Sequence, residues 1–256
     1  MKNLPKLNPS YWILMLICTT MGELIGNLIS RNFEFGYTKG ALIDVCVFSI
    51  LIISVLSFKL RHDFFYWLLI LAGNIGGTNL ADWVTLEPLE NDRKWAALQP
   101  LQLGTRAGSL AVLGALVSVL LVRYVFVRRR GEASIAAGVL YWGAILISST
   151  FGTTSGDFIT NDTPLGAFGG SVALLVLLIG VFAAFRRGWL ALAPAYWAAL
   201  VLMHPVGATI GNYVSKPIGL NLGNVSTNLF LVAIFGLIFA NETRARNPAR
   251  VSAIQD

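Results

Sequence analysis

Charged residues are scarce in this sequence. They make up 12% of its 256 residues, whereas 55% of the residues are hydrophobic. A soluble domain usually carries about twice that share of charge. The apolar residues also occur in runs of about 18 or more, the length that predicts a membrane span. The composition therefore excludes an ordinary soluble domain and predicts a polytopic membrane protein, with the lipid bilayer as a partner.

Cysteine and histidine are also scarce, with two of each. Cys18 and Cys46 lie inside apolar runs and provide neither a disulfide framework nor a metal-binding spacing. The sequence lacks a phosphate-binding P-loop, a Cys-x-x-Cys pair and a His-Glu-x-x-His motif. Among the apolar runs only His204 offers a catalytic base, and no serine is matched to it by spacing. We therefore predict no enzymatic activity and no cofactor, and no metal ligands are assigned.

A repeated unit is built around the dipeptide Tyr-Trp, which occurs four times and ends at Trp12, Trp67, Trp142 and Trp197. Ten residues after each Trp lies a glycine, and fourteen residues after it lies a glycine or an alanine. Fifteen residues after each Trp lies a carboxylate or its amide: Asn27, Asp82, Asp157 and Asn212. Agreement at so many offsets indicates four copies of one unit.

Each unit has a second half, a Gly-x-x-x-Gly start followed by another apolar run. Two spans per unit predict an all-α bundle of eight transmembrane helices, made of four parallel two-helix repeats with pseudo-four-fold or two-fold symmetry. We expect a single membrane domain over residues 1–244, with repeats at about 8–60, 63–127, 138–187 and 193–241. Residues 245–256 are predicted to form a short cytoplasmic tail.

The distribution of basic residues predicts the orientation of the bundle. Of the 19 lysines and arginines, thirteen lie on the side that holds the termini and the even-numbered loops or close to it, and six on the other. Basic residues favour the cytoplasmic side, so both termini and all four Tyr-Trp pairs are predicted to be cytoplasmic. This bias also explains most of the net charge of +6, so no nucleic-acid partner is expected.

The first helix of each unit carries a polar face. On a helix, the positions 7, 11, 15 and 18 residues after each Trp fall within roughly 80° of arc. Fifteen of the sixteen residues at these positions are polar: Thr19, Glu23, Asn27, Ser30, Asn74, Thr78, Asp82, Thr85, Ser149, Thr153, Asp157, Thr160, His204, Asn212 and Ser215, with Ala208 as the exception. Such a face is costly against lipid, so the four faces are predicted to look inward.

This inner face holds the candidate site. Glycines and hydroxyls there are typical of helix packing, but packing does not require the intramembrane carboxylates Glu23, Asp82 and Asp157. The carboxylates, with Asp44, could be set against cations near the outer side of the membrane, at Lys39, Arg106 and Lys216. A buried ion-pair network, a proton relay and a cation site are all open. The predicted transport or binding residues are Glu23, Asn27, Asp82, Asp157, Asn212, Thr78, Thr153, His204, Lys39 and Arg106.

The tandem unit resembles an uncharacterised bacterial integral membrane protein family, which is defined by such a two-helix repeat with a characteristic Trp. Residues 8–241 carry the resemblance, best in the third copy, "YWGAILISSTFGTTSGDFIT", and the first, "YWILMLICTTMGELIGNLIS". The fourth copy departs from the pattern, with Ala208 at a polar position and His204 followed by Pro205. The resemblance implies the fold and a bacterial inner membrane, and it supplies no chemistry.

The function predicted first is a secondary transporter for a small ion or a small polar solute, with proton coupling through the carboxylates. A metal cation is one candidate substrate, because oxygen ligands suit hard cations. Two alternatives remain: an ion channel with a pseudo-four-fold polar pore, and a non-transporting scaffold subunit. The sequence does not set the oligomeric state.

Overall fold

The structure is a computed structural model that describes residues 5–60, 62–94, 98–132 and 134–246. The described residues form eight long helices and no strand, which confirms the all-α prediction. All eight are long and apolar enough to cross a membrane. Their bounds are α1 (Pro9–Asn27), α2 (Tyr37–Ser57), α3 (Asp63–Thr85), α4 (Gly104–Arg130), α5 (Ile135–Asp162), α6 (Gly166–Arg186), α7 (Leu192–Ser215) and α8 (Asn224–Arg246).

Two short helical turns complete the secondary structure. The end of α1 continues into a π-helical turn, η1 (Leu28–Asn32), and the α3–α4 connection contains a 3₁₀ turn, η2 (Asp92–Lys94). The predicted tail begins inside the last turn of α8, and residues 247–256 lie outside the described residues.

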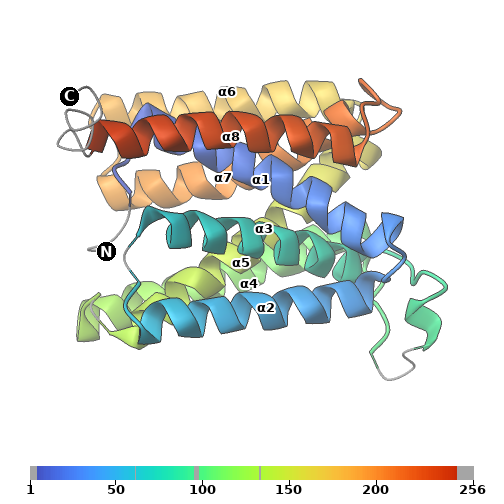
Figure 1. Cartoon of the computed structure of the whole chain (residues 1–256), viewed down its shortest axis with the longest axis horizontal. Helices are drawn as coiled ribbons and strands as arrows, with labels where there is room; N and C mark the ends of the chain where they lie inside the picture. Colours follow the sequence, from blue (N-terminus) through green and yellow to red (C-terminus); the bar gives the residue numbers. More distant parts are fainter. Residues whose placement is uncertain (1–4, 61, 95–97, 133, 247–256) are drawn as a thin grey trace, which may run out of the picture.

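The first helices of the four units form a closed inner ring. Helix α1 packs against α3, α3 against α5, α5 against α7, and α7 against α1 (Figure 1). The fifteen polar residues 7, 11, 15 and 18 positions after each Trp are all buried, and so is Ala208, the apolar residue in this set. The inner ring therefore places the predicted polar faces around one axis.

The second helices lie outside this ring, and each packs mainly on the next unit rather than on its own. Helix α2 packs on α3, α4 on α5 and α6 on α7, while α8 returns to pack on α1 (Figure 1). At the point of closure the side-chain amide of Asn8 donates to both carboxylate oxygens of Glu242, at 3.1 and 3.2 Å. Because each unit completes its neighbour, the start of α1 and the end of α8 meet at one end of the bundle.

Exposure separates the outer helices from the ring. Large apolar side chains on the outer helices are well exposed, as at Ile50 (63%), Ile179 (63%) and Leu237 (74%). These surfaces suit contact with lipid chains, whereas the ring helices bury their polar side chains against one another. The division explains why the inner helices can carry carboxylates at all.

The long α3–α4 connection has a structural role at the start of α2. The carboxylate of Asp92 is buried and accepts hydrogen bonds from the backbone N–H groups of Tyr37 (3.1 Å), Thr38 (2.8 Å) and Leu89 (3.0 Å). Gly36, at φ 81°, turns the chain into α2 directly beside this carboxylate. Free N–H groups at a helix start need acceptors, and here an insert from the next unit supplies them.

Candidate functional site

The ring is closed at one end by the four repeated tyrosines. Their hydroxyl groups form a cycle of hydrogen bonds, with oxygen–oxygen distances of 2.6 Å (Tyr11–Tyr66), 3.4 Å (Tyr66–Tyr141), 2.6 Å (Tyr141–Tyr196) and 3.2 Å (Tyr11–Tyr196). A phenol can donate one hydrogen bond and accept another, so this cycle can satisfy all four. The sequence places these rings at a membrane interface, but the structure turns them inward, where they are buried against one another.

An apolar layer lies next to the tyrosine cycle. It is formed by the residues three positions after each Trp, Met15, Ile70, Ile145 and Leu200, all 0% exposed. These side chains belong to the same hydrophobic core cluster as the tyrosines. The tyrosine cycle and this layer together close the axis to water at this end.

The repeated glycines let adjacent ring helices approach closely. A Cβ at Gly152 would collide with the side chain and backbone of His204, and a Cβ at Gly22 would collide with Asn74. In each case the glycine, ten residues after its Trp, meets the residue seven after the next Trp. Gly77 against Ser149 and Gly207 against Thr19 complete the set. The glycines therefore fix the register of the four helices.

Glu23 directly follows Gly22 on α1. Its side chain is 2% exposed and is surrounded by neutral hydrogen-bond donors. Asn27 donates to its Oε1 at 2.9 Å, and Thr153 donates to Oε2 at 2.9 Å. Thr78 reaches the same Oε2 at 3.4 Å and lies 3.3 Å from the hydroxyl of Thr153. The structure thus brings together four of the predicted site residues, from three different helices.

Asp82, 1% exposed, has a charged partner that the sequence analysis did not identify. A terminal guanidinium nitrogen of Arg31 donates to both of its carboxylate oxygens at 3.1 Å. Arg31 belongs to η1, its side chain is 36% exposed, and its guanidinium lies 5.7 Å from the ring centre of Tyr37. π-Helical turns are frequent at functional sites. Arg31 therefore connects the buried carboxylate to the surface at this end of the ring.

Asp157 has the fewest partners of the three carboxylates. In the described part of the chain, one hydrogen bond reaches it, from the side-chain amide of Asn212 to Oδ1 at 3.0 Å. Asp82 lies one helical turn after Thr78 on α3, and Asp157 lies one turn after Thr153 on α5. Because both threonines contact Glu23, the three acids lie in one part of the ring.

Three residues that were expected to take part in this ion network lie elsewhere. Lys39 is exposed, with its ammonium group over the ring of Phe35, and Arg106 is exposed at the start of α4. Neither forms an ion pair with a described residue. Asp44 accepts a hydrogen bond of 2.6 Å from Asn79, between α2 and α3. The physical reason is that α2 and α4 pack outside the ring, so their first turns do not reach the axis.

His204 is buried in the layer of the glycine crossings. Its Nδ1 lies 2.8 Å from the carbonyl oxygen of Leu200 and 3.1 Å from the hydroxyl of Ser148, while Nε2 has no partner among the described residues. The sequence analysis missed Ser148, although it lies six residues after its Trp and His204 lies seven after the next. Because Nδ1 is bonded to the carbonyl of its own helix, these contacts favour a structural role for this pair.

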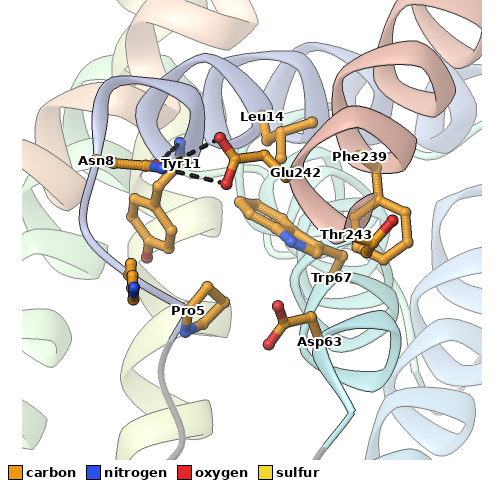
Figure 2. A pocket seen from close by; sticks show the side chains of 10 residues that line it. Pro5, Asn8, Tyr11, Leu14, Asp63, Trp67, Phe239, Glu242 and Thr243 are labelled. Carbon is orange, nitrogen blue, oxygen red and sulfur yellow. Dashed lines mark hydrogen bonds between the residues drawn. The ribbon is translucent and has the colours of Figure 1, made fainter. Parts of the chain in front are cut away.

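A small cleft lies outside the tyrosine cycle, between α1, α3 and α8 (Figure 2). Trp67 forms one wall, and the Asn8–Glu242 hydrogen bonds cross its upper side (Figure 2). The cleft lies where the two ends of the bundle meet, and it is separated from the acidic site by the tyrosine cycle and the apolar layer. It therefore has no part in the candidate site.

The carboxylates do not form a metal centre of the usual kind. No group of three or more His, Cys, Asp or Glu side chains that could hold a metal ion occurs within residues 5–60, 62–94, 98–132 and 134–246. The described site is instead a mixed layer of acids, amides and hydroxyls with two cations at its edge.

These features define a multi-pass membrane protein with a polar site at the centre of a helix ring. A family model described as Repeat of Unknown Function (DUF347) matches residues 140–187 and 195–247. The two matched segments cover the third and fourth Tyr-Trp units. The match supports the expectation of an uncharacterised repeat family. Comparison with curated proteins and with solved structures finds no match.

Proposed function

We propose that this protein is a secondary transporter for a small ion or a small polar solute, coupled to protons through its intramembrane carboxylates. The observation that supports the proposal most is the composition of the axial site. Glu23, Asp82 and Asp157 are all at least 94% buried. Carboxylates at this depth are costly, and they are found where ions or protons move through a membrane protein.

The two ends of the ring support a carrier that opens to one side at a time. The tyrosine cycle and apolar layer close one end, while the partly exposed Arg31 lies over the acids at the other. Movement of Arg31 away from Asp82 would open a path to the site without unpacking the tyrosine end. Alternate opening of two such ends is what a carrier requires.

Proton coupling follows from the proximity of three acids in one buried site. Nearby like charges oppose full ionisation, so a proton and a second cation compete for the same group. A substrate that requires three acidic, histidine or cysteine ligands does not match the described geometry. A small cation, or a solute with a cationic group, matches it better.

The test is a counterflow screen in proteoliposomes loaded with candidate cations and small solutes. We expect saturable exchange of at least one substrate, with a rate that changes when a pH gradient is imposed. No exchange of any substrate and no pH response would favour the scaffold function.

An ion channel is the second candidate, and the arrangement of four ring helices around one axis is the observation that favours it. Bilayer recordings distinguish the two functions. A channel gives unitary currents that do not depend on counterflow, whereas a carrier gives exchange without unitary currents. The packed apolar layer at Met15, Ile70, Ile145 and Leu200 makes the carrier our first proposal.

We also propose that residues 8–127 hold two further copies of the repeat and that the protein lies in a bacterial inner membrane with cytoplasmic termini. The four Tyr-Trp offsets and the excess of basic residues on one side support this proposal. Reporter fusions after Arg130 and after Arg187 should both report the cytoplasm. A periplasmic signal from either fusion would contradict this orientation.

A further inference from the structure

Within the described residues, four buried oxygen atoms on the polar faces of α1, α5 and α7 have no hydrogen-bond partner. They are the carbonyl oxygens of the Asn27 and Asn212 side chains and the hydroxyl oxygens of Thr160 and Ser215. The two asparagines lie fifteen residues after their Trp, and the two hydroxyls lie eighteen after theirs. All four side chains are more than nine-tenths buried, from 0% exposure at Asn212 to 8% at Thr160. Buried polar atoms without partners are rare, so this group is a candidate ligand site.

The amide orientations leave the carbonyl oxygens facing away from the donors. Asn27 uses its NH₂ group to donate to Glu23, and Asn212 uses its NH₂ group to donate to Asp157. Rotating either amide by 180° would place its oxygen against a carboxylate oxygen, which is repulsive. Both carbonyl oxygens therefore stay available as acceptors.

The helices that carry these oxygens are neighbours in the ring. Helix α7, with Asn212 and Ser215, packs between α1, with Asn27, and α5, with Asp157 and Thr160. Asp157 is the one acid here that has neither a contacting cation nor a set of three donors. The site thus contains a carboxylate with one hydrogen bond and four uncompensated oxygens.

The charge balance points to the sign of the ligand. Asp82 is paired with Arg31, and Glu23 accepts hydrogen bonds from three neutral side chains. Asp157 has one hydrogen bond and, among the described residues, no contacting cation, so its carboxylate sets the sign of the ligand. The Asp157 carboxylate and the two amide carbonyls are acceptors, and the two hydroxyls can present their oxygens to a cation, so the lining favours a cation over an anion. A divalent metal ion would lack the three acidic, histidine or cysteine ligands that such sites often use.

We propose that Asp157, Asn212, Asn27, Thr160 and Ser215 form a binding site for one small monovalent cation. Carboxylate, amide and hydroxyl oxygens are ligands for hard alkali ions, and the same acceptors can bind the N–H groups of ammonium. The inference rests on the proposed transport function, because it names the ligand class of that site. It adds that the cation is held on the α5–α7–α1 side of the ring rather than at the Arg31–Asp82 pair.

The experiment measures cation-dependent thermal stability of the full-length protein in detergent micelles. Sodium, potassium and ammonium chloride are each titrated against choline chloride at constant ionic strength. A ligand that binds the folded protein raises its unfolding midpoint in a saturable way. We expect such a rise with at least one of the three small cations, and the cation that gives it identifies the alkali or the ammonium form of the ligand.

Two variants and one control locate the site. Asp157→Asn should abolish the cation-dependent rise, whereas Asp44→Asn, the same change at a buried carboxylate outside the ring, should retain it. Thr160→Val keeps the side-chain shape and removes one unpartnered oxygen, and we expect its apparent affinity to fall by about twofold to tenfold. Thr160→Val also serves as the test should Asp157→Asn not fold.

The outcomes separate this inference from the proposed function. If no cation differs from choline, the four oxygens are satisfied by water only and the inference is overturned. A response that persists in Asp157→Asn, or an unchanged affinity in Thr160→Val, also overturns it. Cation binding in a protein that exchanges nothing in proteoliposomes would support the site and refute the transporter, while exchange without cation-dependent stability would do the reverse.

Discussion

The two ends of the helix ring are built on opposite principles. At one end the same residue, tyrosine, occurs four times and forms one hydrogen-bonded cycle. At the other end the positions fifteen residues after each Trp hold two asparagines and two aspartates. These side chains do not share one pattern of hydrogen bonds. Four identical contacts are sufficient for packing and closure. A ligand that is held to one side of the axis requires the four-fold symmetry to be broken, and the acidic end is where it is broken.

The basic residues follow the same division. Nineteen residues after the Trp, the units with asparagine in the ring carry Arg31 and Lys216, and the units with aspartate carry Leu86 and Asn161. Arg31 reaches forward to Asp82 on the next helix, whereas Lys216 follows the last residue of α7, which packs beside α1. The helix before Asp157 carries Leu86 at this position. Among the described residues no cation forms an ion pair with Asp157, which is the asymmetry that the proposed site uses.

The largest effect is expected where the ring is most regular, at the glycine crossings. Gly152→Ala places a Cβ against the backbone of His204, and we expect it to destabilise the fold by about 1–3 kcal/mol or more. Gly143→Ala on the same helix is the control, since nothing lies within 4 Å of its Cβ position. Unfolding midpoints in detergent measure both. Equal midpoints would show that the crossings do not determine the packing.

Replacing the cations at the acidic end, Arg31 and Lys216, should have a smaller effect on stability. The two substitutions should also differ from each other. Arg31→Gln leaves the buried Asp82 without its ion pair, whereas Lys216 forms no ion pair with a described residue. Because Arg31 is partly exposed, we expect a loss of about 1–3 kcal/mol, between the values of exposed and buried pairs. Lys216→Gln should cost less. Equal losses in denaturant titrations would contradict the assigned asymmetry.

The smallest effects are expected in the tyrosine cycle, and they should resemble one another. Each Tyr→Phe change removes one hydroxyl and should cost about 0.5–1.5 kcal/mol. Thermal unfolding of Tyr11→Phe, Tyr66→Phe, Tyr141→Phe and Tyr196→Phe provides the comparison. A loss of transport in any single variant would show that this end does more than close the ring.

The sequence was sufficient to predict the eight helices and their inward polar faces. Apolar run length determines a span, and the cost of a polar face against lipid determines its direction, so both follow from residue type and spacing. Glu23, Asn27, Thr78 and Thr153 consequently meet where their shared offsets suggest.

The contacts between helices of different units could not be predicted from the sequence in the same way. The outer helices were expected to bring Lys39 and Arg106 to the acids, but each packs on the following unit and keeps its first turn outside. Arg31 was missed because its position is determined by the π-helical turn at the end of α1, which changes the direction of the side chain. Pairing across helices depends on register, and the register comes from the glycine crossings in three dimensions.

The most direct test compares two changes on one helix, at opposite ends of the ring. Asp157→Asn removes the uncompensated carboxylate, and Tyr141→Phe removes one hydroxyl of the tyrosine cycle. Uptake is measured in proteoliposomes for the substrate that the counterflow screen identifies, with unfolding midpoints recorded for both proteins. We expect Asp157→Asn to lose nearly all uptake while remaining folded, and Tyr141→Phe to retain most of it. Wild-type uptake by Asp157→Asn across pH 5 to 8 would contradict the central role of the acidic end.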